Sequence, residues 1–282
     1  MKIEKIIICG AGTMGNGIAH MFALNGFQVQ IYEVNLQNAQ KGLHTIILNL
    51  DRQIKKGLIT EQQKAKTISN LQIINDAREL NRDANLIIEA IYENKDVKLK
   101  LFKELDALIN ADCIFATNTS SISITELSKD IRSDKFIGMH FMNPVPMMKL
   151  VEIIKGYSTS EETYETIFKL CSSIGKEPVT VNDYPGFISN RVLMPLINEA
   201  IYTLYENVAT AEDIDKVMKL GMNHPMGPLQ LADFIGLDVC LDIMNVIQSG
   251  FNDSKYRPCP LLKKLVAAGK LGKKSGEGFY KY

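Results

Sequence analysis

The feature that most constrains this chain is a glycine pattern at the end of its first apolar run. Residues 8–15 read Ile-Cys-Gly-Ala-Gly-Thr-Met-Gly, and the apolar residues before them begin near Ile3. This pattern is typical of a buried strand that turns directly into a helix. We expect Gly10 to make the tight turn, Gly12 to let a pyrophosphate approach the backbone, and Gly15 to let the helix pack closely on the sheet.

The start of the expected helix, at Thr13 and Met14, would direct unpaired N–H groups and the positive end of the helix dipole at phosphates. A second apolar strand, residues 29–32, ends in Glu33. That is about where a dinucleotide site places the acid that accepts hydrogen bonds from a ribose 2′-hydroxyl. The two signals together predict a dinucleotide-binding domain.

The same carboxylate indicates which dinucleotide binds. Glu33 would repel the 2′-phosphate of NADP, and the next residues, Val34 and Asn35, supply no compensating cation. We therefore predict that the cofactor is NAD.

Composition excludes several other classes of function. The chain has 282 residues, of which 46% are hydrophobic, and its 32 acidic residues balance its 32 basic ones. This zero formal net charge argues against a nucleic-acid or anionic-membrane surface. The five scattered cysteines lack metal-ligand spacing, which predicts no metal site and reduced thiols in a cytoplasmic setting. No apolar run reaches the length of a membrane span, and the first strand begins too early to leave room for a signal peptide.

Through residue 183 the chain alternates strands and helices. The helix that follows Thr60 is expected from the capping-box sequence Thr60-Glu61-Gln62-Gln63. This alternation predicts a Rossmann-like α/β fold, with a doubly wound and mainly parallel sheet whose ligand crevice lies at the carboxyl ends of the strands. The other expected helices are residues 35–57, 95–109 and 161–174, and the later expected strands are 71–74, 86–89, 114–117, 136–140, 150–154 and 178–181.

The character of the chain changes at residues 182–186, which read Asn-Asp-Tyr-Pro-Gly. From there it is helical, with strongly apolar segments at 187–206 and 229–247. We predict an NAD-binding domain at 1–183, followed by an all-α C-terminal domain at 184–282 that serves substrate binding and dimerisation. A domain this small and this apolar leaves apolar surface exposed to water, which favours a homodimer that covers it.

Two strand residues form the candidate acid–base pair of this chain. His140 ends an apolar strand, and the carboxyl ends of strands are where doubly wound sheets hold reactive groups. Glu152 is embedded in the apolar strand 150–154, where a lone charge would be costly to desolvate. His140 is the economical partner, because the carboxylate would then set its tautomer. A purely structural ion pair is the alternative interpretation.

Two further polar residues are candidates for contact with a substrate. Ser120 follows the strand 114–117 and so opens onto the same crevice, where its hydroxyl would polarise a substrate oxygen or merely cap the next segment. Asn190 lies one turn into the first helix of the second domain, where it would reach the interdomain cleft or satisfy backbone groups. Spacing alone leaves both choices open.

Six motifs occur in order along the chain. They are Gly10-Ala-Gly-Thr-Met-Gly15, Asn118-Thr-Ser-Ser121, His140-Phe-Met-Asn-Pro-Val-Pro146 with Lys149-Leu-Val-Glu152, Pro185-Gly-Phe-Ile-Ser-Asn-Arg191, His224-Pro-Met-Gly-Pro228 and Gly276-Glu-Gly-Phe-Tyr280. With these motifs the whole chain resembles the L-3-hydroxyacyl-CoA dehydrogenase family, and within it the stand-alone bacterial members that act on 3-hydroxybutyryl-CoA.

The resemblance implies the reversible oxidation of an L-3-hydroxyacyl-CoA by NAD⁺ to a 3-ketoacyl-CoA, in butyrate formation or fatty acid β-oxidation. It implies that His140 is the general base and that Glu152 orients it. Ser120 and Asn190 match residues that contact the substrate near its reacting oxygens. The remaining contacts that it implies are, for the dinucleotide, Glu93, Lys98, Asn143 and Lys274, and for the CoA phosphates, Arg52 and Lys56.

Departures from the family pattern leave some points open. Glu33 stands where Asp is commoner, and Met142 where many members have an aromatic residue. The stretch before His140 is slightly shorter, so either Ser120 or Ser121 meets the substrate. The physiological direction and the acyl-chain preference stay open as well. The rival interpretations are a related sugar-acid dehydrogenase that acts without CoA, and a non-enzymatic, crystallin-like dinucleotide-binding protein.

Overall fold

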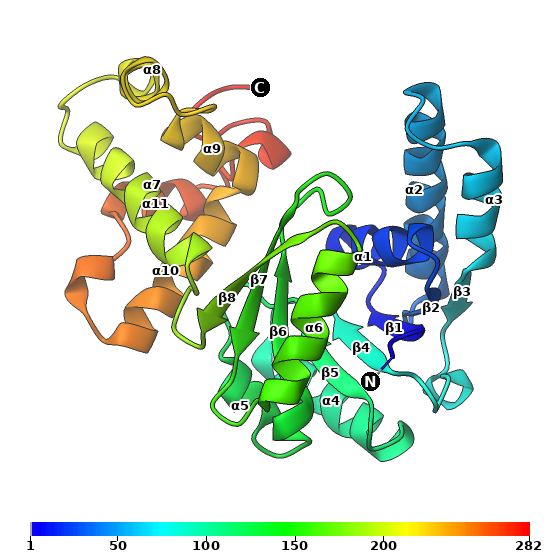
Figure 1. Cartoon of the computed structure of the whole chain (residues 1–282). Coiled ribbons are helices and arrows are strands. Elements are labelled where there is room, and N and C mark those ends of the chain that lie inside the picture. The colour runs from blue at the N-terminus through cyan, green and yellow to red at the C-terminus, as the bar shows by residue number, and fades with distance from the viewer. Residues whose placement is uncertain (1) are drawn as a thin grey trace. The chain divides into compact units, whose positions relative to one another are not determined.

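The computed structural model describes residues 2–282 of the chain, which form two compact units. The first unit extends to Asp183 and is built on a sheet, and the second, Tyr184–Tyr282, is helical (Figure 1). None of the helices within residues 2–282 combines the length and the apolar composition that a bilayer crossing demands. Nor do these residues bring three or more His, Cys, Asp or Glu side chains into an arrangement suited to a metal ion.

The strands of the first unit form one sheet in the order β3-β2-β1-β4-β5-β6-β7-β8. Neighbouring strands are parallel except β6 and β7, which pair antiparallel. The predicted Rossmann-like, mainly parallel sheet is therefore confirmed, and the strand order reverses at β1, where such sheets bind ligands. The strands are β1 (Lys5–Cys9), β2 (Gln28–Tyr32), β3 (Leu71–Ile74), β4 (Leu86–Glu89), β5 (Ile114–Thr117), β6 (Phe136–Phe141), β7 (Leu150–Lys155) and β8 (Glu177–Asn182).

Alternating side chains divide the core of this unit between the two faces of the sheet. On one face, Phe22 of α1 meets Phe141 of β6 edge to face at 6.4 Å, within a large apolar cluster that also includes α6. On the other face, Phe102 of α4 packs against Phe115 and Phe136, with ring centroids 6.0 and 4.8 Å away. The helices are α1 (Thr13–Leu24), α2 (Leu36–Lys55), α3 (Glu61–Ser69), α4 (Lys95–Leu108), α5 (Ile124–Ser128) and α6 (Glu161–Ser173).

Local signals set several of these boundaries, and one helix depends on a distant residue. Both halves of the predicted capping box are present at Thr60, where α3 begins. The short helix α5 was not predicted from the sequence. Its first N–H groups, those of Ile124 and Thr125, donate to the carboxylate of Asp183 at 3.1 and 2.8 Å. Ser123 adds a local cap by accepting the N–H of Glu126 at 3.2 Å, but the Asp183 carboxylate comes from the far end of the unit, so periodicity in the helix itself could not reveal it.

The second unit differs from expectation at two glycines. Gly186 and Phe187 both have positive φ, +78° and +53°, so α7 begins at Ser189 rather than at Phe187. The apolar residues 229–247 do not form one segment, because Gly236, with φ of +107°, separates two helices. The helices of this unit are α7 (Ser189–Tyr205), α8 (Ala211–Gly221), α9 (Pro228–Ile235), α10 (Leu237–Phe251) and α11 (Pro260–Ala267).

Two buried carboxylates tie the C-terminal residues to these helices. Asp233 accepts hydrogen bonds from the N–H groups of Phe279 and Tyr280, at 3.0 and 2.9 Å. Asp215 accepts one from the hydroxyl of Tyr280 at 2.8 Å and another from the N–H of Leu229, at the start of α9, at 2.9 Å. These bonds hold Phe279 and Tyr280 against the apolar core of the unit.

His20 in α1 is an unusual core residue. Its side chain is fully buried, and among the described residues neither ring nitrogen has a hydrogen-bond partner. Burial lowers the pKa of His20 to about 4, because a charged imidazolium would lose its hydration there. The folded protein therefore holds this ring neutral.

We expect His20 to make the protein less stable as the pH falls from about 6.5 toward 4. The unfolded chain takes up the proton near its ordinary pKa of about 6.5, whereas the folded chain resists it. Stability is thus lost over this window, by up to about 3 kcal/mol near pH 4. Urea unfolding at several pH values would show a shallower pH dependence in His20→Leu than in the wild type. His44→Gln, at an exposed position of α2, is the control, and equal slopes in the wild type and His20→Leu would contradict this account.

Candidate active site

The alternation of the strands places four polar side chains on one face of the sheet. Thr117 ends β5 and His140 stands near the end of β6, both on the face against which Phe102 packs. Glu89 of β4 is the register partner of Thr117, and Glu152 of β7 is that of His140. These four residues line the edge where the parallel strands end, which is where doubly wound sheets hold reactive groups.

His140 and Glu152 form a buried pair across the antiparallel strands. The His140 Nδ1 and Glu152 Oε2 atoms are 2.7 Å apart, and the two side chains are 10% and 2% exposed. Directly opposed residues of antiparallel strands bring their side chains this close. With Nδ1 donating to the carboxylate, the lone pair of the neutral ring lies on Nε2. The arrangement suits a histidine that accepts and returns a proton during catalysis.

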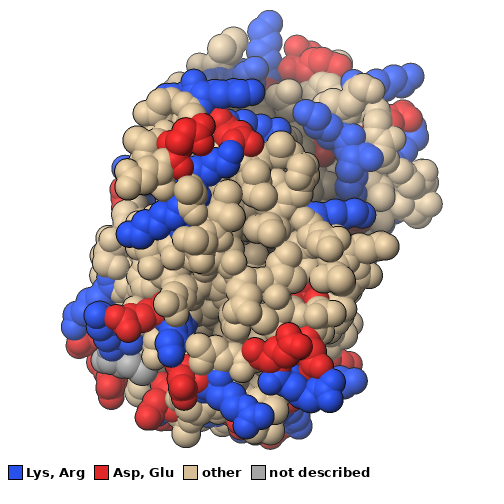
Figure 2. Space-filling view, turned by 90° about the vertical axis from the view of Figure 1, so that its right-hand side faces the viewer, with Lys and Arg blue, Asp and Glu red and all other residues tan. Residues whose placement is uncertain are grey.

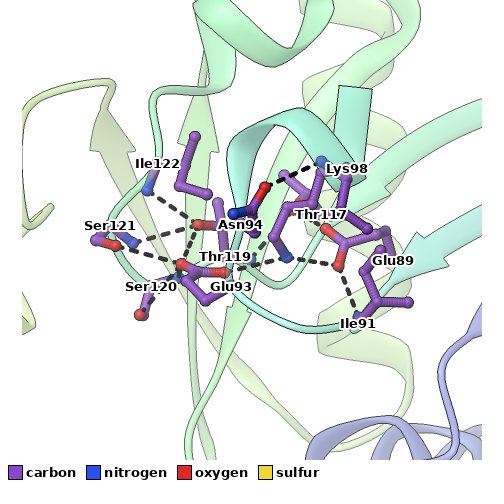
Figure 3. Close-up of polar contacts among 11 residues, drawn as sticks. Glu89, Ile91, Glu93, Asn94, Lys98, Thr117, Thr119, Ser120, Ser121 and Ile122 are labelled. Carbon is purple, nitrogen blue, oxygen red and sulfur yellow. Dashed lines mark hydrogen bonds and ion pairs between the residues drawn. The ribbon is translucent and has the colours of Figure 1, made fainter. Parts of the chain in front are cut away.

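A turn after β5 carries the two candidate serines, and Glu93 binds it (Figure 3). One oxygen of Glu93 accepts hydrogen bonds from the Thr119 hydroxyl at 2.5 Å, the Ser120 N–H at 3.0 Å and the Ser121 hydroxyl at 3.3 Å. Ser121 is buried, whereas Ser120 is half-buried. Of the two serines that the sequence left open, Ser120 is thus the more accessible to a substrate.

Lys98, expected from the resemblance as a dinucleotide contact, is wholly buried. Its Nζ lies 2.5 Å from Glu89 Oε1 and 3.0 Å from Glu93 Oε2, so its charge is shared by two carboxylates. Burial opposes the ionisation of Glu93, but the charge of Lys98 and the hydrogen bond from Thr119 outweigh it and lower the pKa of Glu93. Lys98 therefore contacts Glu93 from a buried position, and its charge keeps the Glu93 carboxylate ionised.

A pocket of about 740 Å³ lies beside the glycine turn, and its walls include the ends of β1 and β2 and the loop after β4. Glu33 lines it and accepts hydrogen bonds from the N–H groups of Ala11 and Asn35, at 3.3 and 3.1 Å. Gly10 and Gly12 line it as well. A crevice at this position, with a carboxylate beside the glycine turn, fits the adenosine part of a dinucleotide.

The glycines have the steric roles that the sequence suggests. A Cβ on Gly10 would lie 2.7 Å from the Ala90 oxygen, and one on Gly15 only 2.0 Å from the Gly10 oxygen. At Gly12 a Cβ would meet no atom within 4 Å, so the space beside that backbone is open to a ligand. No side chain caps the N-terminus of α1, and its first turn, at Thr13 and Met14, carries no acid. The site therefore fits a pyrophosphate.

The remaining predicted residues belong to other elements of the two units. Asn143 is exposed on the loop between β6 and β7. Arg52 and Lys56 are exposed at the end of α2, where Arg52 donates to Asn49. Two others belong to the second unit, where Asn190 is buried in α7 and Lys274 pairs with Asp238 at 2.6 Å.

The structure also brings in residues that the sequence analysis did not single out. Glu89 ends an apolar strand, and Glu152 was identified because it is an acid in an apolar strand. The same criterion could have identified Glu89. Asn118 accepts a hydrogen bond from the N–H of Phe141 at 2.9 Å and so joins the ends of β5 and β6. Lys41 and Lys100 line the dinucleotide pocket, and only the fold brings them there.

Charge on the surface is mixed, as the balanced composition predicts. On the face that Figure 2 draws, Lys and Arg side chains stand in separate groups, several of them beside Asp or Glu. A broad uncharged area lies between these groups. A continuous basic surface of the kind that binds nucleic acid is not present on this face.

Comparison with known proteins identifies both units. The family model described as "3-hydroxyacyl-CoA dehydrogenase, NAD binding domain" matches residues 5–184, and that described as "3-hydroxyacyl-CoA dehydrogenase, C-terminal domain" matches residues 186–282. A probable 3-hydroxybutyryl-CoA dehydrogenase of Bacillus subtilis is 55% identical, over 100% of this chain and 98% of that protein. A 3-hydroxybutyryl-CoA dehydrogenase of Bradyrhizobium diazoefficiens is 51% identical, over 99% of this chain and 96% of that protein.

The fold has a close counterpart among solved structures. The crystal structure of an (S)-3-hydroxybutyryl-CoA dehydrogenase from Ralstonia eutropha matches with a TM-score of 0.97 and 47% sequence identity. The match covers 100% of this chain and 99% of that one. The cofactor of the first unit is therefore NAD, as the glycine turn and Glu33 predicted.

We expect Glu33→Ala to lose the preference for NADH over NADPH. Removing the carboxylate ends the repulsion of a 2′-phosphate, and Lys41 and Lys100 line the same pocket with positive charge. The ratio of the NADPH and NADH dissociation constants should fall by at least about tenfold, which corresponds to about 1.4 kcal/mol. Titration calorimetry measures both constants.

The lysine contribution can be separated from the loss of Glu33. Lys41→Ala in the Glu33→Ala background should weaken NADPH binding more than NADH binding. Lys66→Ala, an exposed lysine of α3 outside the pocket lining, is the matched control. An unaltered coenzyme ratio in Glu33→Ala would show that this carboxylate does not select the dinucleotide.

Proposed function

Because the chain belongs to the 3-hydroxyacyl-CoA dehydrogenase family, we propose that it interconverts (S)-3-hydroxybutyryl-CoA and acetoacetyl-CoA, using NAD. The named activity of the relatives supports this substrate. The observation that carries the proposal is the buried His140–Glu152 pair at the carboxyl edge of an NAD-binding sheet. Oxidation of NADH by acetoacetyl-CoA, followed by absorbance, is the direct test.

His140 is the proton-transfer group in this proposal. Oxidising a secondary alcohol to a ketone requires the O–H proton to leave as a hydride leaves the same carbon. When NAD⁺ is bound, it supplies the acceptor for that hydride. His140 Nε2 takes the hydroxyl proton, while Glu152 holds Nδ1 and stabilises the imidazolium that forms. In the reductive direction the same nitrogen returns the proton to the C3 oxygen.

Ser120 and Asn190 complete the proposed site. Hydrogen-bond donors at the C3 oxygen stabilise the negative charge that develops there during reduction. Ser120 lies on the turn that Glu93 holds, at the same edge of the sheet as His140. We assign Asn190 the second contact on the resemblance of its motif.

We expect His140→Gln to reduce turnover by about 10³-fold or more, because it removes the group that accepts the proton. NADH binding should change little, since the coenzyme pocket lies beside β1, β2 and β4. Glu152→Gln should lose at least about tenfold in kcat, because its amide no longer orients the ring as a carboxylate does. Steady-state kinetics and NADH titration measure these effects.

The double variant distinguishes a catalytic pair from two independent residues. If His140 and Glu152 act as a unit, the double variant is little worse than His140→Gln alone. A loss equal to the product of the two single losses would reject the pair as a unit.

We propose that the CoA moiety supplies binding energy through Arg52 and Lys56. Replacing both by Ala should raise the KM for acetoacetyl-CoA by about tenfold and make activity less sensitive to salt, because screened ion pairs are lost. Lys103→Ala, at an exposed lysine of α4, is the control. An unchanged KM would exclude these two cations. Equal turnover of free acetoacetate would instead reject CoA recognition and favour the sugar-acid alternative.

We also propose that the protein acts as a cytoplasmic homodimer formed through the helical unit. On α8 and α9 the apolar residues Val217, Leu220 and Phe234 are 59%, 76% and 61% exposed. A two-fold contact between identical surfaces would cover them. Light scattering should report twice the chain mass of 31.6 kDa, and a monomer at micromolar concentration would contradict the dimer.

A further inference from the structure

Glu89 is a buried acid that the proposed chemistry does not use. It ends β4 at the point where the strand order reverses, with Cys9 of β1 as its neighbour on one side and Thr117 of β5 on the other. Its side chain is fully buried. A carboxylate at such a position is costly to desolvate, so the groups that bind it indicate its structural role.

Three groups bind this carboxylate (Figure 3). The ammonium of Lys98 lies 2.5 Å from Oε1, the N–H of Ile91 donates to Oε1 at 2.7 Å, and the hydroxyl of Thr117 donates to Oε2 at 2.6 Å. Burial raises the pKa of Glu89, and Lys98 opposes that shift. The carboxylate thus joins a helix, a loop and a neighbouring strand.

Two chains of contacts lead from Glu89 to the turn that carries Ser120. One runs through Lys98 to Glu93, which accepts the N–H of Ser120 at 3.0 Å. The other runs through Thr117, whose oxygen accepts the N–H of Thr119 at 3.2 Å. Both chains end on adjacent residues of the same turn.

A third contact leads from Glu89 to the coenzyme pocket. Its bond to the N–H of Ile91 shapes the loop after β4, and Ala90, Ile91 and Tyr92 of that loop line the pocket. The N–H of Ala90 donates to the Cys9 oxygen at 2.8 Å, directly before the glycine turn. One buried carboxylate therefore braces both the pocket wall and the Ser120 turn.

We propose that Glu89 is a positioning residue that couples the coenzyme pocket to the substrate-side turn. The proposal rests on the function given above, because the role of the turn follows from the proposed substrate. Lys98 carries the coupling, since its one positive charge serves both Glu89 and Glu93. Replacing Glu89 by Gln removes one of the two negative charges that Lys98 pairs with, which leaves Glu93 as its only carboxylate in the cluster. The new N–H₂ group also takes the place of an acceptor, so it either faces the Lys98 ammonium or requires the Thr117 hydroxyl to turn its proton away. The cluster must then rearrange, and Glu93 moves with it.

The test compares four forms of the full-length protein: wild type, Glu89→Gln, Ser120→Ala and the double variant. Glu89→Gln should lower kcat/KM for acetoacetyl-CoA by about 10- to 100-fold, as displacements of about 1 Å do. It should also weaken NADH binding, measured without substrate. Because both changes act on the same turn, the double variant should lose much less kcat/KM than the product of the single losses.

Asp215→Asn separates positioning from a general loss of stability. Asp215 is a buried acid of the second unit, bound to N–H groups and a hydroxyl, and it takes no part in the proposed site. Its variant should lose thermal stability but keep kcat/KM. Independent, multiplying effects of Glu89→Gln and Ser120→Ala would overturn the proposal, as would unchanged NADH affinity in Glu89→Gln. A wild type inactive on acetoacetyl-CoA would reject the proposed function, while NADH affinity would still decide the role of Glu89 at the pocket wall.

Thr117 provides the same test if Glu89→Gln does not fold. Thr117→Val removes both the bond to Glu89 and the acceptor for the Thr119 N–H, whereas Thr117→Ser keeps both. The valine variant should lose kcat/KM and the serine variant should retain most of it. Equal kcat/KM in the two variants would overturn the coupling.

Discussion

The cost of burying a charge determines the organisation of this protein's proposed active site. An ionised carboxylate inside a sheet persists only where an opposite charge or hydrogen-bond donors hold it. Glu152 meets this condition through His140, and Glu89 meets it through Lys98 and Thr117. Each pairing fixes the orientation of a group that faces the carboxyl edge of the sheet. The same condition that stabilises the fold thus orients the groups to which we assign the chemistry.

The direction of one strand decides what those charges can reach. Because β7 runs antiparallel to β6, Glu152 lies directly opposite His140, and the two side chains share one face. The parallel pairing of β4 with β5 sets Glu89 beside Thr117 in the same way. Alternation then places all four residues on the face that α4 covers, opposite the apolar face packed by α1 and α6.

The helical unit uses buried carboxylates for a different purpose. Asp215 and Asp233 bind backbone N–H groups and the Tyr280 hydroxyl, so they close the C-terminal residues onto the helices. The Asp215 carboxylate fits here because Gly227 has no side chain. A Cβ at that position would lie 2.2 Å from the Asp215 carboxyl carbon. In this unit the buried carboxylates stabilise the fold, whereas at the sheet edge they orient side chains of the proposed site.

Several features of this protein follow from its sequence alone because they depend on neighbouring residues. The glycine turn follows from local sterics, the start of α3 from its capping box, and β3, β4 and β5 from short apolar runs between turn residues. Glu152 within an apolar strand required a partner, and His140 was the economical choice. Other features needed the tertiary structure: the Asp183 cap on α5, the break at Gly236, the lysines of the coenzyme pocket and the Glu89–Lys98–Glu93 cluster. Periodicity shows that a side chain is buried, but its partner comes from another strand or helix, so only the packing of these elements decides which charge neutralises which.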